Sequence, residues 1–210
     1  MYKLFWDPGS ANMAPHAVLE EIGCPYELVK VDIASGAHKQ PAYLKLNPNA
    51  RVPTLVDGDK VMYESAAIVI YLAEQHPEAK LMPAPGTPER MKFLQWLMYL
   101  TNTIQDSFIL YYHPDNFFPD DKSRAALKAA GEARLEKQWA VVDAALGENG
   151  PYLTGASFSA ADSYLHMLAR WSRNCARPAW AFPHIARQLD LVKARPAVRR
   201  MMAQEGLPEF

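Results

Sequence analysis

Residues 52–75 read VPTLVDGDKVMYESAAIVIYLAEQ, and their pattern decides the fold of the first part of the chain. The run 52–56 is extended and apolar, Asp57-Gly58 is a hairpin turn signal, and 60–63 supplies the returning strand. A helix then follows Glu64-Ser65, with apolar residues at helical spacing: Ile68, Val69, Tyr71 and Leu72. The stretch therefore predicts an antiparallel hairpin followed by a helix.

Upstream of this hairpin the sequence predicts a strand, a helix and a second strand. Residues 2–6 are aromatic and aliphatic, 10–22 carry apolar residues at helical spacing, and Gly23 stands where a helix C-cap glycine is expected. Residues 26–33 predict the second strand, and a crossover of this length makes the two strands parallel and right-handed. With a short helix expected over 38–46, the pattern predicts a βαβ unit followed by ββα, which gives four strands and three helices.

A proline-rich segment follows the third of these helices. Pro77, Pro83, Pro85 and Pro88, together with Gly86, fit neither a helix interior nor a central strand. We therefore interpret residues 79–88 as a linker.

Beyond the linker the sequence predicts helices alone, over 89–112, 123–146, 160–171 and 185–202, the last broken by Pro196. Segregation of sheet and helices along the chain is typical of separate layers or domains. We expect an α/β domain over 1–78 and an all-α domain over 89–210, joined by the linker.

Composition narrows the class of protein. Half of the 210 residues are apolar, which suffices for a sizeable core and excludes global disorder. Lys plus Arg number 22 against 23 Asp plus Glu, so no basic field exists for nucleic acid or an anionic membrane. No run approaches the ~18 apolar residues of a membrane span, and the N-terminus lacks a signal peptide, so we expect a cytoplasmic protein. Cys24 and Cys175 form neither a disulfide scaffold nor a metal cluster, and we expect no metal.

Two features of the 52–75 stretch indicate a ligand site. Pro53 begins an internal strand, which either a trans proline or a cis Val52–Pro53 bond explains; the cis form leaves the N–H and C=O of Val52 to pair with a peptide-like ligand. Ser65 can cap the following helix, whose N-terminus also suits a carboxylate, while Glu64 suits an ammonium group. An α-amino acid head satisfies both, although an ordinary capped helix with an exposed Glu explains the residues equally well.

These residues resemble a known family. The βαβ–ββα unit, Val52-Pro53-Thr54-Leu55, and the run from Glu64-Ser65 to Tyr71-Leu72-Ala73-Glu74 are similar to the N-terminal domain of cytosolic glutathione S-transferases, which has the thioredoxin fold. Residues 47–51, Asn-Pro-Asn-Ala-Arg, resemble the segment before that family's cis-proline. Ser159-Ala160-Ala161-Asp162 resembles its capping motif on a buried helix, so we assign Ser159 and Asp162 to folding stability and not to the active site. The resemblance covers essentially the whole chain.

The resemblance implies a binding site for glutathione as co-substrate. Glu64 and Ser65 would hold the amine and carboxylate of the γ-glutamyl group. Val52 would pair through its backbone with the cysteinyl part, helped by Pro53. The glycyl carboxylate would meet basic or polar side chains of the preceding loop: Arg51 with Lys39, His38 or Gln40.

The resemblance also places the sulfur-activating residue in the turn after the first strand. Trp6 stands near the position of the tyrosine in tyrosine-type members and has no hydroxyl, and Ala11 replaces the cysteine of bacterial members with a similar turn. Ser10 and Asn12 remain as candidates, with Ser10 the first choice. Ser10 can equally be an N-cap of the first helix, and the two roles can coexist.

The electrophile is expected between the two domains. Candidate lining residues are aromatic and include Trp6, Phe108, Tyr111, Tyr112, Trp171 and also His166, although aromatic residues at helical spacing more often belong to the core. Gln105 stands where some bacterial members have a histidine. The resemblance implies a homodimer, formed around the first long helix, on which Asn102, Thr103 and Asp106 lie.

Three hypotheses about function remain open at this point. The first is attack of the glutathione thiolate on a hydrophobic electrophilic small molecule. The second is glutathione-dependent disulfide reduction or peroxidase activity at the same site, which a Ser10/Asn12 pair leaves possible. The third is a binding protein that kept the fold and lost catalysis, because Trp6 and Ala11 occupy two of the family's chemical positions.

Overall fold

The computed structural model describes residues 1–210, and its contacts divide the chain into two compact units. The first unit comprises Met1–Met82 together with Lys193–Glu209, and the second comprises Pro83–Val192 with Phe210. The described helices include none that is both long enough and apolar enough to span a bilayer.

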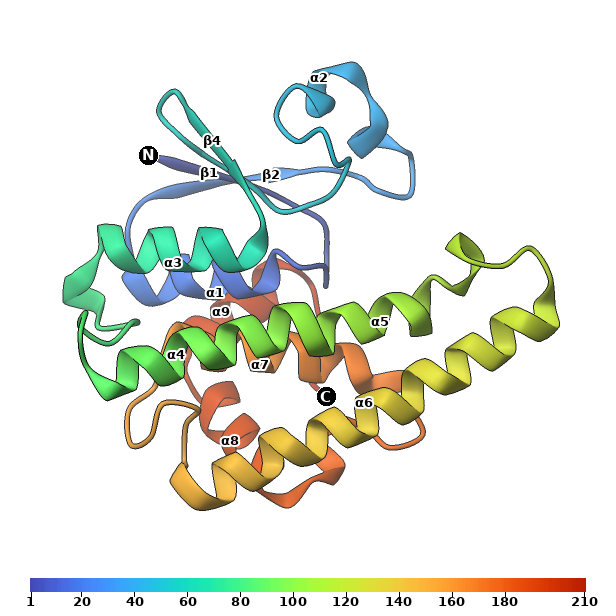
Figure 1. Ribbon diagram of the computed structural model, residues 1–210. Helices are drawn as coiled ribbons and strands as arrows, with labels where there is room; N and C mark the ends of the chain where they lie inside the picture. Colours follow the sequence, from blue (N-terminus) through green and yellow to red (C-terminus); the bar gives the residue numbers. More distant parts are fainter. The chain divides into compact units, whose positions relative to one another are not determined.

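The first unit is built on a four-stranded mixed sheet (Figure 1). Its strands are β1 (Tyr2–Trp6), β2 (Tyr26–Lys30), β3 (Thr54–Asp57) and β4 (Lys60–Tyr63), in the order β2-β1-β3-β4. β1 and β2 are parallel, whereas β3 is antiparallel to both β1 and β4, which confirms the predicted βαβ–ββα topology. The central pair places Leu4 opposite Leu55, and both side chains are buried.

Helices cover the sheet on both faces. α1 (Met13–Ile22) and α3 (Ser65–Gln75) pack side by side, and their buried residues complete the core around Leu4: Val18, Leu19, Ile68 and Leu72 (Figure 1). A smaller cluster of Val31, Tyr43 and Val52 packs with Phe5, and it includes residues of and near the short helix α2 (Pro41–Leu44). Because side chains alternate along a strand, Leu4 and Phe5 supply the two opposite faces.

Several elements of this unit are shorter than the sequence predicts, among them α2 against the expected 38–46 and β3 against 52–56. α1 begins at Met13, not at residue 10, because residues 7–12 form a separate turn. Its predicted end is confirmed by Gly23, whose left-handed backbone lets its N–H donate to the Leu19 carbonyl. β2 ends at Lys30, opposite Trp6, because β1 ends there and offers no further residue to pair with; the Val31 N–H still donates to the Trp6 carbonyl.

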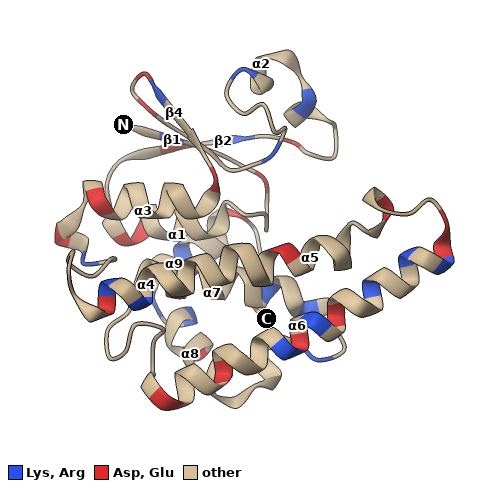
Figure 2. Cartoon of the chain, in the orientation of Figure 1, with Lys and Arg blue, Asp and Glu red and all other residues tan.

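The second unit is helical, as predicted. α4 (Pro88–Tyr99) and α5 (Gln105–Tyr112) form one run, joined by a turn of π-helix at Leu100–Ile104. α6 (Asp121–Asn149), α7 (Ala160–Trp171) and α8 (Pro183–Lys193) follow. Acidic and basic residues are interspersed along α6 (Figure 2), in line with a balanced surface rather than a field of one sign.

The predicted capping box starts the buried helix α7. Ser159 donates from its backbone N–H and its hydroxyl to the Asp162 carboxylate, at 2.8 and 2.9 Å. Asp162 is fully buried and also accepts from the Leu153 N–H and the Gln188 amide. These contacts confirm a structural role for the pair.

The last helix, α9 (Pro196–Gln204), belongs to the first unit, whereas the sequence analysis placed all of 89–210 in the helical domain. α9 packs against α1, where Arg195 pairs with Glu21 and Arg200 with Glu20. The periodicity of a helix shows that it has an apolar face but not which unit receives that face. This limit explains the difference.

Candidate functional site

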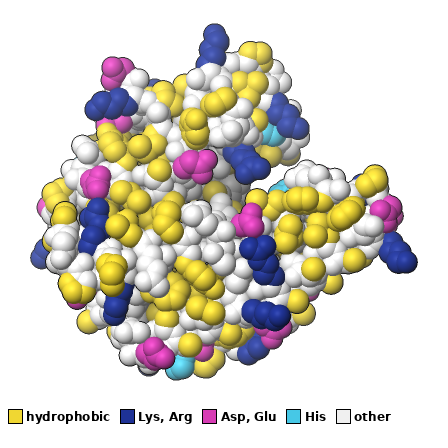
Figure 3. Space-filling model, viewed as in Figure 1, with side chains coloured by type: hydrophobic (Ala, Val, Ile, Leu, Met, Phe, Trp, Pro, Cys, Tyr) yellow, Lys and Arg dark blue, Asp and Glu magenta, His cyan; other side chains and the backbone are white.

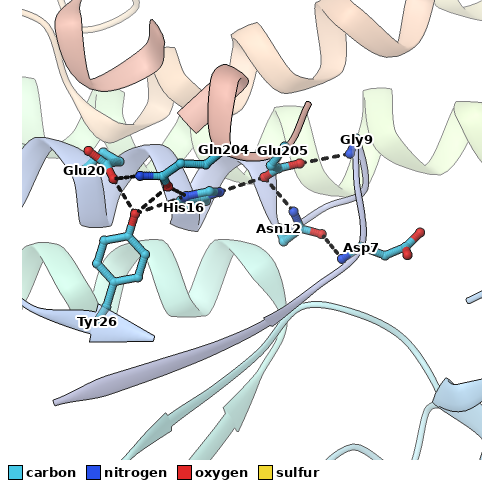
Figure 4. A network of polar contacts seen from close by, with 8 residues as sticks. All are labelled: Asp7, Gly9, Asn12, His16, Glu20, Tyr26, Gln204 and Glu205. Atoms are coloured by element: carbon cyan, nitrogen blue, oxygen red, sulfur yellow. Dashed lines mark hydrogen bonds and ion pairs between the residues drawn. The ribbon is translucent and has the colours of Figure 1, made fainter. Parts of the chain in front are cut away.

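The turn that follows β1 is closed by a single side chain. The backbone N–H of Asp7 donates to Asn12 Oδ1 at 3.0 Å, and that of Ser10 donates to the Asp7 carbonyl at 3.2 Å. Gly9 has a φ of 72°, a left-handed conformation that glycine adopts without steric cost. Residues 7–12 thus form a defined loop leading into the N-terminus of α1 (Figure 4).

Ser10 and Asn12 both lie in this turn but differ in burial and in hydrogen bonding. Asn12 is fully buried, its Nδ2 donates to Glu205 Oε1 at 2.8 Å, and its Oδ1 is occupied by Asp7. The Ser10 hydroxyl is partly exposed and makes no hydrogen bond within the chain; in particular it does not cap α1. Of the two candidates, only Ser10 has a polar group available to a ligand.

Glu64 and Ser65 stand at the start of α3, close to the same turn. Glu64 is exposed and has φ 75° and ψ 105°, a conformation that costs a non-glycine residue free energy and recurs at functional sites. Ser65 is buried, and its hydroxyl donates to the Ala11 carbonyl at 2.6 Å instead of capping its own helix. This bond ties the N-terminus of α3 to the turn, and it corrects the expected capping role of the Ser65 side chain.

Val52 and Pro53 immediately precede β3. The bond between them is cis, which decides between the two explanations of Pro53 in the sequence. Val52 lies outside the strand pairing, and its backbone N–H and C=O make no hydrogen bond within the chain. The Arg51 carbonyl before it is held by Tyr43 Oη at 2.7 Å and by Asn47 Nδ2 at 2.8 Å. A fixed backbone therefore offers one donor and one acceptor at Val52.

Basic side chains accompany this segment. Arg51 and Lys39 are both exposed, Lys39 at the end of a short 3₁₀ turn over Ala37–Lys39. His38 in the same turn has a buried Nδ1 without a hydrogen-bond partner. The structure gives neither Arg51 nor Lys39 a partner within the chain, so both charges are available to an anion.

The aromatic residues predicted for the electrophile pocket come together within the helical unit. Phe108 stacks on Tyr112 with ring centroids 5.9 Å apart and meets Trp171 edge-on at 5.8 Å. Tyr111 packs against Tyr112 and donates to the Asn174 carbonyl at 2.6 Å. Phe108 and Tyr111 are buried, while Tyr112 and Trp171 are partly exposed. Two predicted members lie apart from this cluster. Trp6 belongs to the first unit, where its ring lies near that of His16. His166 is buried in α7, with its ring centroid 5.1 Å from that of Phe210.

Two residues next to the turn were missed in the sequence. Glu205, at the end of α9, and His16, on α1, are both buried and hydrogen-bond to each other at 2.8 Å (Figure 4). A histidine on the apolar face of the first helix was the available signal for His16. Nothing local marks Glu205 as a residue of this site, because its partners lie at the other end of the chain.

Comparisons with known proteins agree with this geometry. Residues 1–74 match the family model of the glutathione S-transferase N-terminal domain. Glutathione S-transferase 3 of Zea mays is 35% identical over 98% of this chain and 95% of its own length. A crystal structure of a glutathione transferase from Methylococcus capsulatus superposes with a TM-score of 0.87 at 34% identity, over 98% of this chain and 99% of that one. A homologue from Sulfitobacter, solved with bound glutathione, gives 0.89 at 27% identity over 99% of both chains. Full-length similarity at this level shows that the chain belongs to the glutathione S-transferase family.

Proposed function

We propose that this protein is a glutathione transferase that ionises the thiol of glutathione and directs it at a hydrophobic electrophile. The observation that carries the proposal is the Ser10 hydroxyl, which has no partner in the chain and stands in the turn that leads into α1. The unpaired backbone of Val52 and the exposed Glu64 lie in the same unit. Together they match the parts of a tripeptide ligand that the family is expected to bind.

We assign the ligand contacts by the chemistry of each group. The N–H and C=O of Val52 pair with the cysteinyl backbone, as an added strand would. The backbone N–H groups at the start of α3, at Ser65, receive the γ-glutamyl carboxylate, and Glu64 receives its ammonium. Arg51 and Lys39 neutralise the glycyl carboxylate. All of these residues belong to the first unit.

The chemical step depends on ionisation of the thiol. A free thiol has a pKa of about 8.5, so only a few per cent is thiolate at neutral pH. Lowering that pKa by about 2 requires about 2.7 kcal/mol of preferential stabilisation of the thiolate. A hydrogen bond from Ser10 Oγ favours the charged sulfur, and the N-terminal dipole of α1 adds to it. The thiolate then forms a carbon–sulfur bond, the leaving group departs with its electron pair, and the thiol proton goes to solvent.

We also propose that the electrophile is held by the aromatic cluster of Phe108, Tyr111, Tyr112 and Trp171. The partly exposed rings of Tyr112 and Trp171 are the members that can contact a substrate. Phe108 and Tyr111 are buried and pack against these two rings.

The protein is proposed to act as a homodimer through α4. Met91, Leu94 and Met98 are exposed apolar residues, with 64%, 38% and 38% of their surface accessible, and their spacing places them on one side of the helix. In the space-filling view, hydrophobic side chains lie among charged ones over this part of the molecule (Figure 3). An apolar stripe of this kind suits a second copy of the same chain.

The test of the proposed function is the pKa of glutathione bound to the protein, followed through the ultraviolet absorbance of the thiolate during a pH titration. We expect the pKa to fall well below that of free glutathione, and Ser10→Ala to return it most of the way. Turnover of an aryl halide should fall in parallel with the thiolate fraction. A parent protein that leaves the thiol pKa unchanged would contradict the proposal.

A further inference from the structure

One buried carboxylate connects the end of the chain to the turn that carries Ser10. Glu205, whose side chain is fully buried, accepts from the Gly9 backbone N–H at 2.9 Å. It also accepts from Asn12 Nδ2 and faces His16 Nδ1, each at 2.8 Å (Figure 4). Three nitrogen atoms, of Gly9, Asn12 and His16, thus converge on one carboxylate.

The second nitrogen of His16 also faces an acceptor. His16 Nε2 lies 2.6 Å from Gln204 Oε1, and the orientation of that amide is fixed because Gln204 Nε2 donates to Glu20 at 2.8 Å. Both ring nitrogens of His16 thus have polar partners, and its contact with Glu205 is fully buried. Glu20 is itself paired with Arg200, so these polar contacts continue into a network between α1 and α9.

The way α9 ends places Glu205 against the turn. The Leu207 N–H donates to Met202 at 2.9 Å and the Gly206 N–H to Ala203 at 3.1 Å, which is a Schellman motif with Gly206 at a φ of 65°. This reversal directs the chain after Glu205 back over the turn, where Leu207 Cδ2 lies 3.5 Å from the position that a Cβ on Gly9 would occupy. Glu205 is thus held by its own helix end while it binds Gly9 and Asn12.

We propose that Glu205 is the positioning residue of the sulfur-activating turn. It binds the residues on both sides of Ser10, through the Gly9 backbone and the Asn12 side chain, and Asn12 in turn holds the Asp7 N–H. The direction of the Ser10 hydroxyl is therefore set by the last helix of the chain. This inference rests on the proposed function, because it assigns a role in orienting the group that is to meet the sulfur.

The same interface supplies a matched control. Glu21, near the other end of α1, receives two hydrogen bonds from the Arg195 guanidinium, from Nε at 2.5 Å and Nη2 at 2.8 Å. Like Glu205, it is a largely buried acid that joins α1 to α9, but its hydrogen bonds go to Arg195 and not to the 7–12 turn. Replacing Glu21 weakens the attachment of α9 and leaves the turn alone.

The experiment compares Glu205→Ala and Glu205→Gln with Glu21→Ala and Glu21→Gln. For each variant we measure thermal unfolding, KM for glutathione, kcat, and the pKa of the bound thiol. We expect all four to unfold at lower temperature than the parent. Only the Glu205 variants should raise the pKa of the bound thiol, by about 1 for Glu205→Ala, which means about tenfold less favourable ionisation. The glutamine variant keeps an acceptor for Gly9 and should show the smaller rise.

The outcomes separate this inference from the proposed function. One outcome is that the parent and the Glu205 variants lower the pKa of bound glutathione equally. That result would overturn the role of Glu205 and leave the proposed function standing. An equal rise of the bound-thiol pKa in the Glu205 and Glu21 variants would also overturn the role of Glu205. Such a result would show a general effect of weakening the attachment of α9. If Glu205→Ala does not fold, Glu205→Gln supplies the same comparison with Glu21→Gln.

Discussion

The environment of Cys175 keeps its thiol protonated and therefore unreactive. Burial, together with the nearby charge of Glu132, raises the pKa of its thiol to about 11, and burial also raises the pKa of Cys24. At pH 8 a thiol with that pKa is about 0.1% thiolate, and the thiolate is the reactive form. Neither cysteine therefore competes with bound glutathione as a nucleophile.

We predict that iodoacetamide at pH 8 leaves Cys175 essentially unmodified over a time in which a free thiol reacts fully. Its modification should accelerate only as the pH approaches 11, because the folded environment favours the protonated thiol up to that pH. Mass spectrometry of the intact protein and of its peptides measures the result. The unfolded protein in urea is the control and should react at both cysteines. Rapid alkylation of Cys175 in the folded protein, with loss of activity, would refute the prediction.

The residues of the turn show what a sequence can specify at this scale. Ser10 and Asn12 were both candidates because both are polar and lie at the expected place. The sequence made Ser10 the first choice but gave no reason to set Asn12 aside. That reason comes from Glu205, which occupies the Asn12 amide from the far end of the chain. For the same reason the hydroxyl of Ser65 was expected at its own helix end and instead meets the Ala11 carbonyl.

The capping box of Ser159 and Asp162 at the start of α7 was predicted from four neighbouring residues. Its contribution to the free energy of unfolding can be tested. Asp162→Ala leaves the donors of Ser159, Leu153 and Gln188 buried without their acceptor. Each unsatisfied donor costs about 1–3 kcal/mol, so we predict a loss of about 3 kcal/mol or more in the free energy of unfolding. Ser159→Ala keeps the carboxylate and its other donors, and we predict a loss of about 1 kcal/mol.

Urea denaturation of these two variants measures both losses. Glu148→Ala is the control, since Glu148 is an exposed acid near the end of α6 and should change the stability by no more than about 0.5 kcal/mol. Equal losses in Asp162→Ala and Ser159→Ala would show that the extra buried donors find other partners.

A second prediction concerns α4, whose exposed apolar residues are Met91, Leu94 and Met98. Met91→Glu combined with Met98→Glu places two charges on the face that we assign to the dimer. We expect the parent to sediment as a dimer at micromolar concentration and this variant as a monomer, because burying an unpaired carboxylate is strongly unfavourable. Val141→Glu, at a residue of α6 that is 50% exposed, is the control and should remain dimeric. A parent that sediments as a monomer would contradict the assignment.

At the scale of the whole molecule, most of the architecture could be predicted because it follows from local patterns. The hairpin at Asp57-Gly58 and the break between α8 and α9 at Pro196 are encoded by neighbouring residues. The assignment of α9 could not be predicted in this way. Pro196 separates α8 from α9 in the sequence, but the partners of α9, among them Glu20 and Glu21, lie near the start of the chain.

The assignment of α9 to the first unit predicts which helices unfold together. α8 and α9 are separated by only two residues, yet α9 shares a unit with α1 through two ion pairs and the buried contact of His16 with Glu205. Cooperative units of a protein exchange their amide hydrogens together. We therefore predict that the amides of α9 exchange with the rates and denaturant dependence of α1, and that those of α8 follow the helical unit.

Hydrogen exchange followed by mass spectrometry, on peptides that divide the chain near Lys193, tests this pairing. Glu205→Ala should accelerate exchange in α9 and α1 together and leave α8 unchanged, because the lost carboxylate has donors only in the first unit. Exchange of α9 in step with α8 would instead mean that continuity of the chain outweighs its contacts with α1. In that case the end of the chain could not hold the Ser10 turn in place. A positioning residue must stay bound to the turn for as long as the turn keeps its structure.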